Sequence, residues 1–185
     1  AFLEGHDIHT STASQVFRVP LDEVTSELRS KAKAVNFGIV YGISEFTLAK
    51  NIGVSRFEAK QFIDRYFERY PGVRRYMDDA VQTGHEMGYV KTLMNRRRYL
   101  PELTSSNFNL RAFGERCAMN SPIQGTAADI IKLAMIRVDR ALKERKLKAR
   151  LILQVHDELL IEVLPEEEET LPNCLPWAKY SLSSH

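Results

Sequence analysis

The sequence has few cysteines, no long apolar run and no glycine-rich phosphate loop, and each shortage excludes a class of protein. Its two cysteines, Cys117 and Cys174, provide neither a disulfide framework nor metal-ligand spacing, and they suit a reducing compartment, so we expect a cytoplasmic protein. No apolar run approaches the roughly 20 residues that span a bilayer, and no basic and apolar leader opens the sequence, so we expect no membrane partner. The absence of a GxxxxGK(S/T) loop excludes a P-loop nucleotidase.

Charge of one sign is not in large excess either, since 26 basic and 24 acidic residues leave a net charge of +2. A balance this even does not indicate nucleic-acid binding by itself. The charges are nevertheless clustered, with basic residues at 96–98 and 137–150 and acidic residues at 166–169. Each cluster taken alone is typical of a solvated surface.

Hydrophobic periodicity predicts a mostly helical chain with two short hairpins. Helices are expected over residues 7–17, 25–42, 45–51, 55–70, 73–87, 107–119 and 122–146. In the last of these, Pro122 suits the first turn, and one apolar face is expected from Ile123, Ala127, Ile130, Ala134, Val138 and Leu142. Hairpins are expected within residues 88–103 and 151–163, the second turning at His156 and Asp157. No repeat or low-complexity linker marks a domain boundary.

The helix expected over residues 25–42 carries two stripes of different chemistry, at about 100° per residue. One stripe is aliphatic and typical of a buried face: Leu28, Ala32, Val35 and Ile39. The other combines two cations with two aromatic rings: Arg29, Lys33, Phe37 and Tyr41. We therefore expect these two rings to point away from the core.

The second stripe suits a nucleoside triphosphate. Arg29 and Lys33 lie one turn apart, where their charges repel by about 0.2–0.5 kcal/mol unless an anion lies between them. Fixed cations stabilise the negative charge that spreads over phosphate oxygens in nucleotidyl transfer. Phe37 and Tyr41 could stack on a sugar and a base. The same spacing is equally consistent with aromatics packed on a neighbouring subdomain and cations that face water.

The expected turn at His156 and Asp157 lacks the glycine or asparagine that usually relieves such a reversal. It allows the carboxylates of Asp157 and Glu158 to protrude, and Mg²⁺ usually takes one or two carboxylates plus substrate phosphates, as in two-metal sites. An ordinary acidic turn is an equal alternative. A Ser/His/Asp triad is disfavoured because adjacent His and Asp side chains diverge and no nucleophile elbow is present.

Together these segments resemble DNA polymerase family A, the bacterial DNA polymerase I family. The pattern R-x3-K-x3-FG-x2-YG, from Arg29 to Gly42, resembles the fingers helix, motif B of the family. LQVHDEL, residues 153–159, resembles the palm hairpin, motif C, and NSPIQGTAADIIK, residues 120–132, resembles the helix between them. Order and spacing also agree, and the resemblance runs from about Glu4 to Thr170.

The resemblance implies an α+β fold in which a mostly helical fingers subdomain joins a small antiparallel palm sheet, an incomplete right-hand polymerase fold. Residues 1–119 would be mainly fingers, 120–169 partial palm with the motif C hairpin, and 170–185 a divergent tail. The implied function is template-directed DNA polymerisation in replication and repair, in which a dNTP is joined to a primer 3′ end. Primer–template DNA, dNTPs and Mg²⁺ in a two-metal site are the implied partners and cofactor.

The family's functional residues carry over to specific positions. Arg29 and Lys33 would contact the incoming triphosphate, Phe37 would lie by its sugar, and Tyr41 near the template base. Asp157 would bind a catalytic metal ion with Glu158 beside the metals, so the implied catalytic residues are Asp157, Glu158 and Lys33. Minor-groove contacts, which are similar for all correct base pairs, would come from Asn120, Gln124, Gln154 and His156.

Three features depart from the family pattern. Ser30 stands where the family often has a second arginine, which leaves the triphosphate pair intact. The family's motif A, resembling DYSQIE and carrying the second metal-binding aspartate, would precede Glu4 and is absent. We therefore expect a piece of a longer protein, inactive alone unless another chain supplies motif A. The segment from Thr170 lacks the family's final helix and strand and contains Pro172 and Pro176, so we expect a premature or frame-shifted end in preference to a natural variant tail.

Two other functions stay open from the residues themselves. One is a non-catalytic nucleic-acid-binding module, or a remnant, that keeps the cationic stripe and the arginines at 96–98 but does not turn over. Tighter DNA binding with the correctly paired nucleotide would favour the polymerase over this module. The other is a metal-dependent hydrolase built on His156, Asp157 and Glu158, which is disfavoured because no HExxH motif accompanies them.

Overall fold

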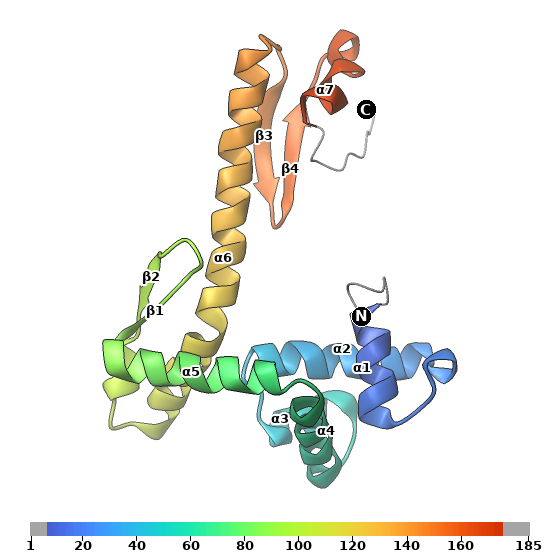
Figure 1. Cartoon of the computed structure of the whole chain (residues 1–185), viewed down its shortest axis with the longest axis vertical. Helices are drawn as coiled ribbons and strands as arrows, with labels where there is room; N and C mark the ends of the chain where they lie inside the picture. Colours follow the sequence, from blue (N-terminus) through green and yellow to red (C-terminus); the bar gives the residue numbers. More distant parts are fainter. Residues whose placement is uncertain (1–6, 176–185) are drawn as a thin grey trace. The chain divides into compact units, whose positions relative to one another are not determined.

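The computed structural model describes residues 7–175, which form seven α-helices and two antiparallel hairpins (Figure 1). This mostly helical α+β architecture confirms the predicted fold class. The chain divides into two compact units, Ala1–Gln124 and Gly125–His185, and each is described by itself. Within residues 7–175, no helix is both long enough and apolar enough to cross a membrane.

The first unit begins with four helices that have side-chain caps. These are α1 (Ile8–Phe17), α2 (Ser26–Val40), α3 (Glu45–Ile52) and α4 (Arg56–Arg69). Asp7, Thr25, Ser44 and Ser55 precede them, and each side chain accepts a hydrogen bond from a backbone N–H of the first turn. Such caps satisfy donors that the helix itself leaves free, so the four helix starts follow from local sequence.

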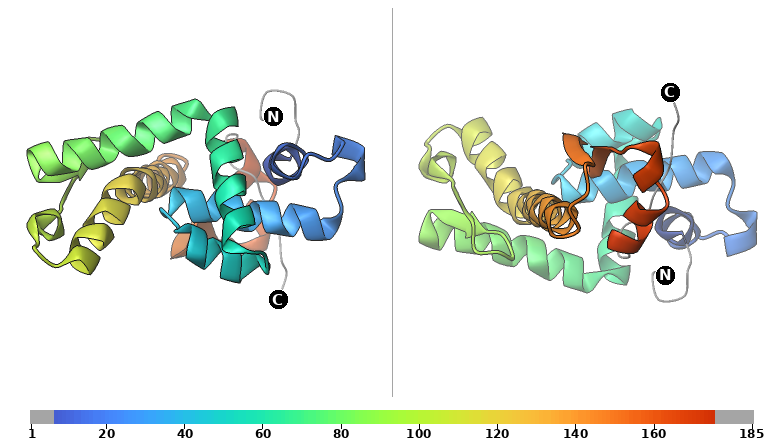
Figure 2. Two further views of the ribbon diagram at one scale, coloured as in Figure 1. Left: turned by 90° about the horizontal axis from the view of Figure 1, so that it is seen from below. Right: turned by 90° about the horizontal axis from the view of Figure 1, so that it is seen from above.

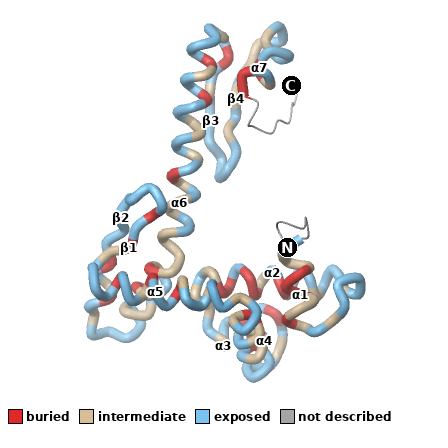
Figure 3. Tube along the Cα trace, viewed as in Figure 1, coloured by how far each residue is buried: buried red, intermediate tan, exposed pale blue. Residues whose placement is uncertain are grey.

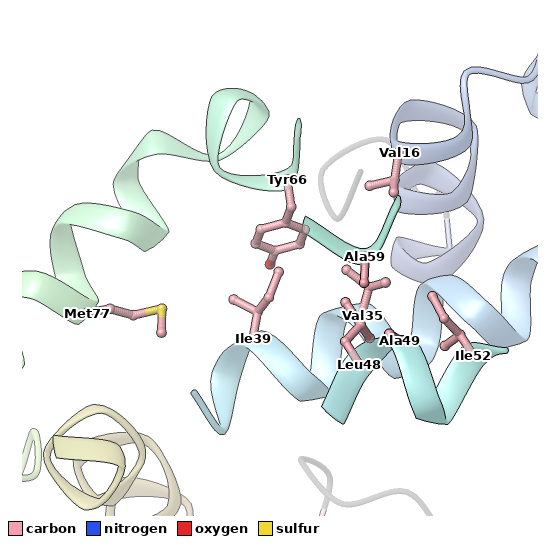
Figure 4. Packing of buried hydrophobic residues seen from close by; sticks show 9 residues of the cluster. All are labelled: Val16, Val35, Ile39, Leu48, Ala49, Ile52, Ala59, Tyr66 and Met77. Atoms are coloured by element: carbon pink, nitrogen blue, oxygen red, sulfur yellow. The ribbon is translucent and has the colours of Figure 1, made fainter. Parts of the chain in front are cut away.

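The aliphatic stripe of α2 lies at the centre of the first core. Ala32 and Val35 are fully buried and Ile39 nearly so, which confirms the predicted inner face. Figure 4 shows Val35 beside Leu48 and Ala59, where α2, α3 and α4 meet. Buried positions of α1 to α4 are marked in Figure 3.

The rest of the first unit packs α5 (Pro71–Met87) and a hairpin against the start of α6. The hairpin comprises β1 (Tyr89–Lys91) and β2 (Arg97–Tyr99), followed by the 3₁₀ turn η3 (Pro101–Thr104). Both views of Figure 2 show α5 beside the first part of α6. A Cβ on Gly84 would lie 2.9 Å from a methyl carbon of Leu103, so glycine is what permits α5 this close approach.

One long helix, α6 (Phe108–Glu144), replaces the two helices expected over residues 107–119 and 122–146. The expectation that Pro122 opens a helix is wrong, because this proline lies inside α6. Proline lacks the N–H that an interior helical position would donate. The Tyr76 hydroxyl donates a 2.9 Å hydrogen bond to the Met119 carbonyl in the preceding turn, a contact from α5 that local sequence rules cannot anticipate.

The apolar face expected along this helix is only partly buried. The six residues share one side of α6 as expected, but Val138 and Leu142 are buried whereas Ile123, Ala127 and Ile130 are exposed. Periodicity identifies an apolar stripe, but its burial requires another element to cover it.

The second unit combines the end of α6 with a hairpin and a short terminal helix. Strands β3 (Arg150–Val155) and β4 (Glu158–Glu162) pair antiparallel around His156 and Asp157, which confirms the predicted turn. The 3₁₀ turn η4 (Pro165–Glu167) and α7 (Thr170–Cys174) follow. Leu171, Cys174 and Leu175 are buried in a core with Val138 and Leu142. The divergent tail was expected over residues 170–185; its first part contains α7, and the part from residue 176 onward lies outside the described residues.

Candidate functional site

The outer face of α2 presents the predicted stripe of cations and rings. Arg29, Lys33, Phe37 and Tyr41 are all exposed, with half of the Phe37 and Tyr41 surface accessible. This confirms that the rings point away from the core. The Lys33 ammonium lies 5.8 Å from the Phe37 ring centre, within the range of a cation–π contact. Among the described residues, Lys33 has no carboxylate partner.

Arg29, in contrast, is held by an acid that sequence reasoning missed. Its Nε and Nη2 donate to the two carboxylate oxygens of Asp7, each over 3.0 Å, in a bidentate pair. The Arg29 guanidinium and the Thr10 hydroxyl and N–H hold the pKa of the Asp7 carboxyl well below its usual range. Asp7 also caps α1, so one side chain starts that helix and orients the arginine of α2. It also neutralises part of the repulsion expected between Arg29 and Lys33.

His9 is a second residue of this face that the sequence analysis missed. Its Nδ1 lies 2.9 Å from the Asn36 amide nitrogen, and its ring centre lies 5.9 Å from that of Phe37. The buried Thr12 hydroxyl donates to the Asn36 carbonyl oxygen, so the amide nitrogen must be the donor toward His9. His9 Nδ1 is then the acceptor, which assigns the proton of the neutral ring to Nε2. The sequence offered one signal for His9. This residue lies in the first turn of a predicted helix, two residues after Asp7, which caps that helix.

The two glycines of the motif have structural roles at the end of α2. A Cβ on Gly38 would lie 2.7 Å from Ile43 Cγ2, closer than real contacts allow. Gly42 has φ +65°, and a Cβ there would lie 3.0 Å from Arg116 Cγ and 3.1 Å from Met119 Cε. Glycine at position 38 therefore lets Ile43 pack back against α2, and glycine at position 42 lets the chain turn where it lies against α6.

Two of the predicted DNA contacts, Asn120 and Gln124, are also in the first unit. They are four residues apart on α6, so they project from the same side of that helix. Because Gly42 lies against Arg116 and Met119, the end of α2 and the turn that carries Asn120 are neighbours. The turn of α6 that begins at Met119, and with it Asn120, therefore follows directly on the contact with the end of α2.

The remaining predicted residues are at the β3–β4 turn of the second unit. His156 has φ +52°, a conformation that a non-glycine residue rarely adopts and that clusters at functional sites. The Gln154 amide donates a 2.5 Å hydrogen bond to the His156 carbonyl and holds the turn. The Asp157 and Glu158 side chains are exposed beside it.

Two exposed carboxylates fit the donor set of a magnesium site only in part. Mg²⁺ takes hard oxygen ligands, commonly one or two carboxylates together with phosphates and water. Within residues 7–175, no group of three or more His, Cys, Asp or Glu side chains forms a metal site. Asp157 and Glu158 can therefore supply protein ligands to a shared site, and the other ligands would come from elsewhere.

The comparisons with known proteins agree with this arrangement of motifs. The model of DNA polymerase family A matches residues 1–177, so the chain belongs to that family. The match confirms the resemblance and continues past Thr170, where we had placed its end.

Individual relatives give the extent of the similarity. The chain is 61% identical over 176 residues to DNA polymerase I of Bacillus subtilis (strain 168) and 60% identical over 176 residues to that of Bacillus caldotenax. Each alignment covers 95% of the chain but 20% of the relative, so the chain spans about a fifth of these proteins. A solved structure, the POL domain of Pol1 from M. smegmatis in complex with DNA primer-template and dNTP, is similar with a TM-score of 0.86 and 50% identity. That similarity covers 93% of this chain and 30% of the solved one.

Proposed function

We propose that this chain supplies the fingers and part of the palm of a template-directed DNA polymerase. The observation that carries the proposal is the outward face of α2, where cations and rings follow one another, while the aliphatic stripe of the same helix is buried. A solved relative with 50% identity binds primer-template and dNTP, which supports the same substrates here. The boundaries at residues 119 and 169 between fingers, palm and tail stay a prediction.

In this proposal, the α2 face binds the incoming nucleotide. Lys33 and Arg29 bind the triphosphate, and the bidentate Asp7 pair keeps the Arg29 guanidinium in one orientation. The Nε2–H of His9 is a further donor beside Phe37. Fixed donors stabilise the charge that develops on phosphate oxygens as the primer 3′ oxygen attacks and pyrophosphate leaves.

The ring residues would position the nascent base pair. Phe37 would pack against the sugar and Tyr41 against the template base, since exposed rings at the end of a helix can stack on such groups. Contacts to the primer and template would come from Asn120, Gln124, Gln154 and His156. Amide side chains donate to the acceptors that the minor groove presents in every base pair.

Asp157 would be a ligand for divalent metal, with Glu158 beside the metals, and Mg²⁺ in a two-metal arrangement would be the specific form. Bound metal would activate the primer hydroxyl and neutralise the leaving phosphates. A second aspartate would come from motif A, carried by another chain or by a longer form of this one. We also propose the cytoplasm as the compartment, because Cys117 and Cys174 are free thiols.

Primer extension tests the proposal directly. The 185-residue chain is assayed with Mg²⁺, first alone and then with an added fragment that carries motif A and further palm strands. We expect extension only with the fragment, and chelation of Mg²⁺ should stop it. No extension in either case, with DNA binding retained, would instead identify a non-catalytic nucleic-acid-binding module.

A pair of lysine variants tests the role of the α2 face in the same assay. Lys33→Ala should lower extension by about 10²-fold, the usual effect of removing one preorganised donor. Lys31→Ala is the matched control because Lys31 lies on the same helix but pairs with Glu27 over 2.7 Å. Equal losses in both variants would refute the proposed triphosphate site.

A further inference from the structure

The β1–β2 hairpin presents a face of rings and cations that no part of the proposed nucleotide site uses. Register pairs Tyr89 with Tyr99 and Lys91 with Arg97. Alternate residues of a strand share a face, so these four side chains lie together. The intervening Val90 is only 3% exposed and packs inward with Leu100, which places the four on the outer side of the hairpin.

The contacts within this face join rings to cations. The Tyr89 and Tyr99 ring centres are 5.6 Å apart. The Arg97 guanidinium lies 4.7 Å from the centre of the Tyr89 ring, and the Lys91 ammonium lies 5.7 Å from it. Tyr99 is 62% exposed, so the platform is open to a ligand.

A pocket of about 620 Å³ opens beside the same strand. Tyr89 and Lys91 line it, together with Arg75, Tyr76 and Asp79 of α5, all within the first unit. Its volume is in the range of small-molecule sites and can admit a nucleobase with its sugar. The carboxylate of Asp79, the one acid among the described residues that line the pocket, can accept a hydrogen bond from the amino group of a base.

We propose that the face made of Tyr89, Lys91, Arg97 and Tyr99, with its pocket, binds single-stranded DNA. Aromatic platforms combined with cations bind unpaired strands because every base has a face that can stack and every linkage carries a charge. One base would occupy the pocket against Tyr89, and the flanking phosphates would lie on Lys91 and Arg97. A duplex keeps its bases stacked on one another and cannot use the rings. This inference depends on the proposed function only for the identity of the strand, which would be the unpaired template. That the face binds a single strand is inferred from the geometry of the hairpin alone.

The test measures fluorescence anisotropy of a labelled dT12 oligonucleotide with the full 185-residue chain. Tyr89→Ala should weaken binding by about 5- to 150-fold, the range for loss of one stacked base. Tyr89→Phe keeps the aromatic ring and should bind dT12 within about twofold of the parent chain. This variant shows whether the loss in Tyr89→Ala comes from the missing ring. Phe57→Ala, which removes a ring that is 70% exposed on α4, is the matched control and should not change affinity.

Salt dependence tests the two cations. A double variant, Lys91→Ala with Arg97→Ala, should reduce the slope of log affinity against log salt by about 1.4, since each phosphate contact on a single strand contributes about 0.7. A control double variant, Lys50→Ala with Lys60→Ala, removes the same charge from exposed positions of α3 and α4 and should keep the slope. Equal changes in both double variants, or equal competition by a blunt duplex, would overturn the proposal.

The outcome is independent of the polymerase test. Unchanged dT12 binding in the hairpin variants, with primer extension still dependent on Lys33, would refute this inference and leave the proposed function standing. Loss of dT12 binding in the same variants, without any extension by the complemented chain, would support the hairpin site and refute the polymerase.

Discussion

The motif glycine Gly38 offers the sharpest test of how the α2 face is held. It is buried in α2, and Gly38→Ala would place a Cβ 2.7 Å from Ile43 Cγ2. Ile43 packs against the core formed by Val35, Ile39 and their neighbours, so it has little room to move. Overpacking of this kind costs about 1–3 kcal/mol, and a contact this short belongs at the upper end.

Part of that cost is offset by the helix itself. Alanine is favoured over glycine by about 1 kcal/mol in a helix interior. The expected net effect of Gly38→Ala is therefore a loss of about 2 kcal/mol in the free energy of unfolding, measured by urea denaturation followed by circular dichroism.

Gly72→Ala is the matched control for this substitution. Gly72 is also helical, its φ is not positive, and a Cβ there would meet no atom within 4 Å. It should leave stability unchanged or raise it by up to about 1 kcal/mol. Adding Ile43→Ala to Gly38→Ala should relieve the clash, so the two changes together should cost less than the sum of their separate costs. A Gly38→Ala chain at least as stable as the parent would refute the packing argument.

Two further predictions concern contacts that join separate helices. The pKa of Asp7 is lower in the folded chain than in the unfolded chain, where it is about 4. The pairing of Asp7 with Arg29 therefore stabilises the fold fully above pH 4, and this stabilisation is lost as the pH falls through the folded pKa. Asp7→Asn keeps a residue that can cap α1. At pH 7 this variant should therefore unfold at a lower urea concentration than the parent chain, and in strong acid at nearly the same concentration. A difference that persists in acid would contradict this. Tyr76→Phe removes the donor to the Met119 carbonyl and should cost about 0.5–1.5 kcal/mol in urea unfolding, whereas Tyr41→Phe, on an exposed ring, should cost less.

Local signals in the sequence predicted much of the fold and of the candidate site. A helix was expected to begin at residue 25, and the Thr25 hydroxyl caps α2 there by accepting a hydrogen bond from the Leu28 N–H. The two stripes of α2 followed from helical periodicity alone, because the side-chain direction in a helix depends on the number of residues between two positions. The turn at His156 was likewise placed from the change between apolar arms and a polar centre.

The contacts that sequence reasoning missed join partners that are distant in sequence. Asp7 and Arg29 are 22 positions apart, and His9 and Asn36 are 27 apart. No periodic pattern links such residues, since their contact depends on how α1 packs against α2. Pro122 was misplaced for the same reason, because local rules place proline at a helix start and do not include a hydrogen bond from another helix.

By itself, then, the sequence determined which residues of α2 face outward and which residues form the β3–β4 turn. These properties depend on helix and strand geometry within a few residues. Only the tertiary structure decided that Asp7 orients Arg29, that His9 joins the face, and that two cations of the hairpin contact the Tyr89 ring. Such contacts arise from packing between elements, and packing is a property of the folded chain as a whole.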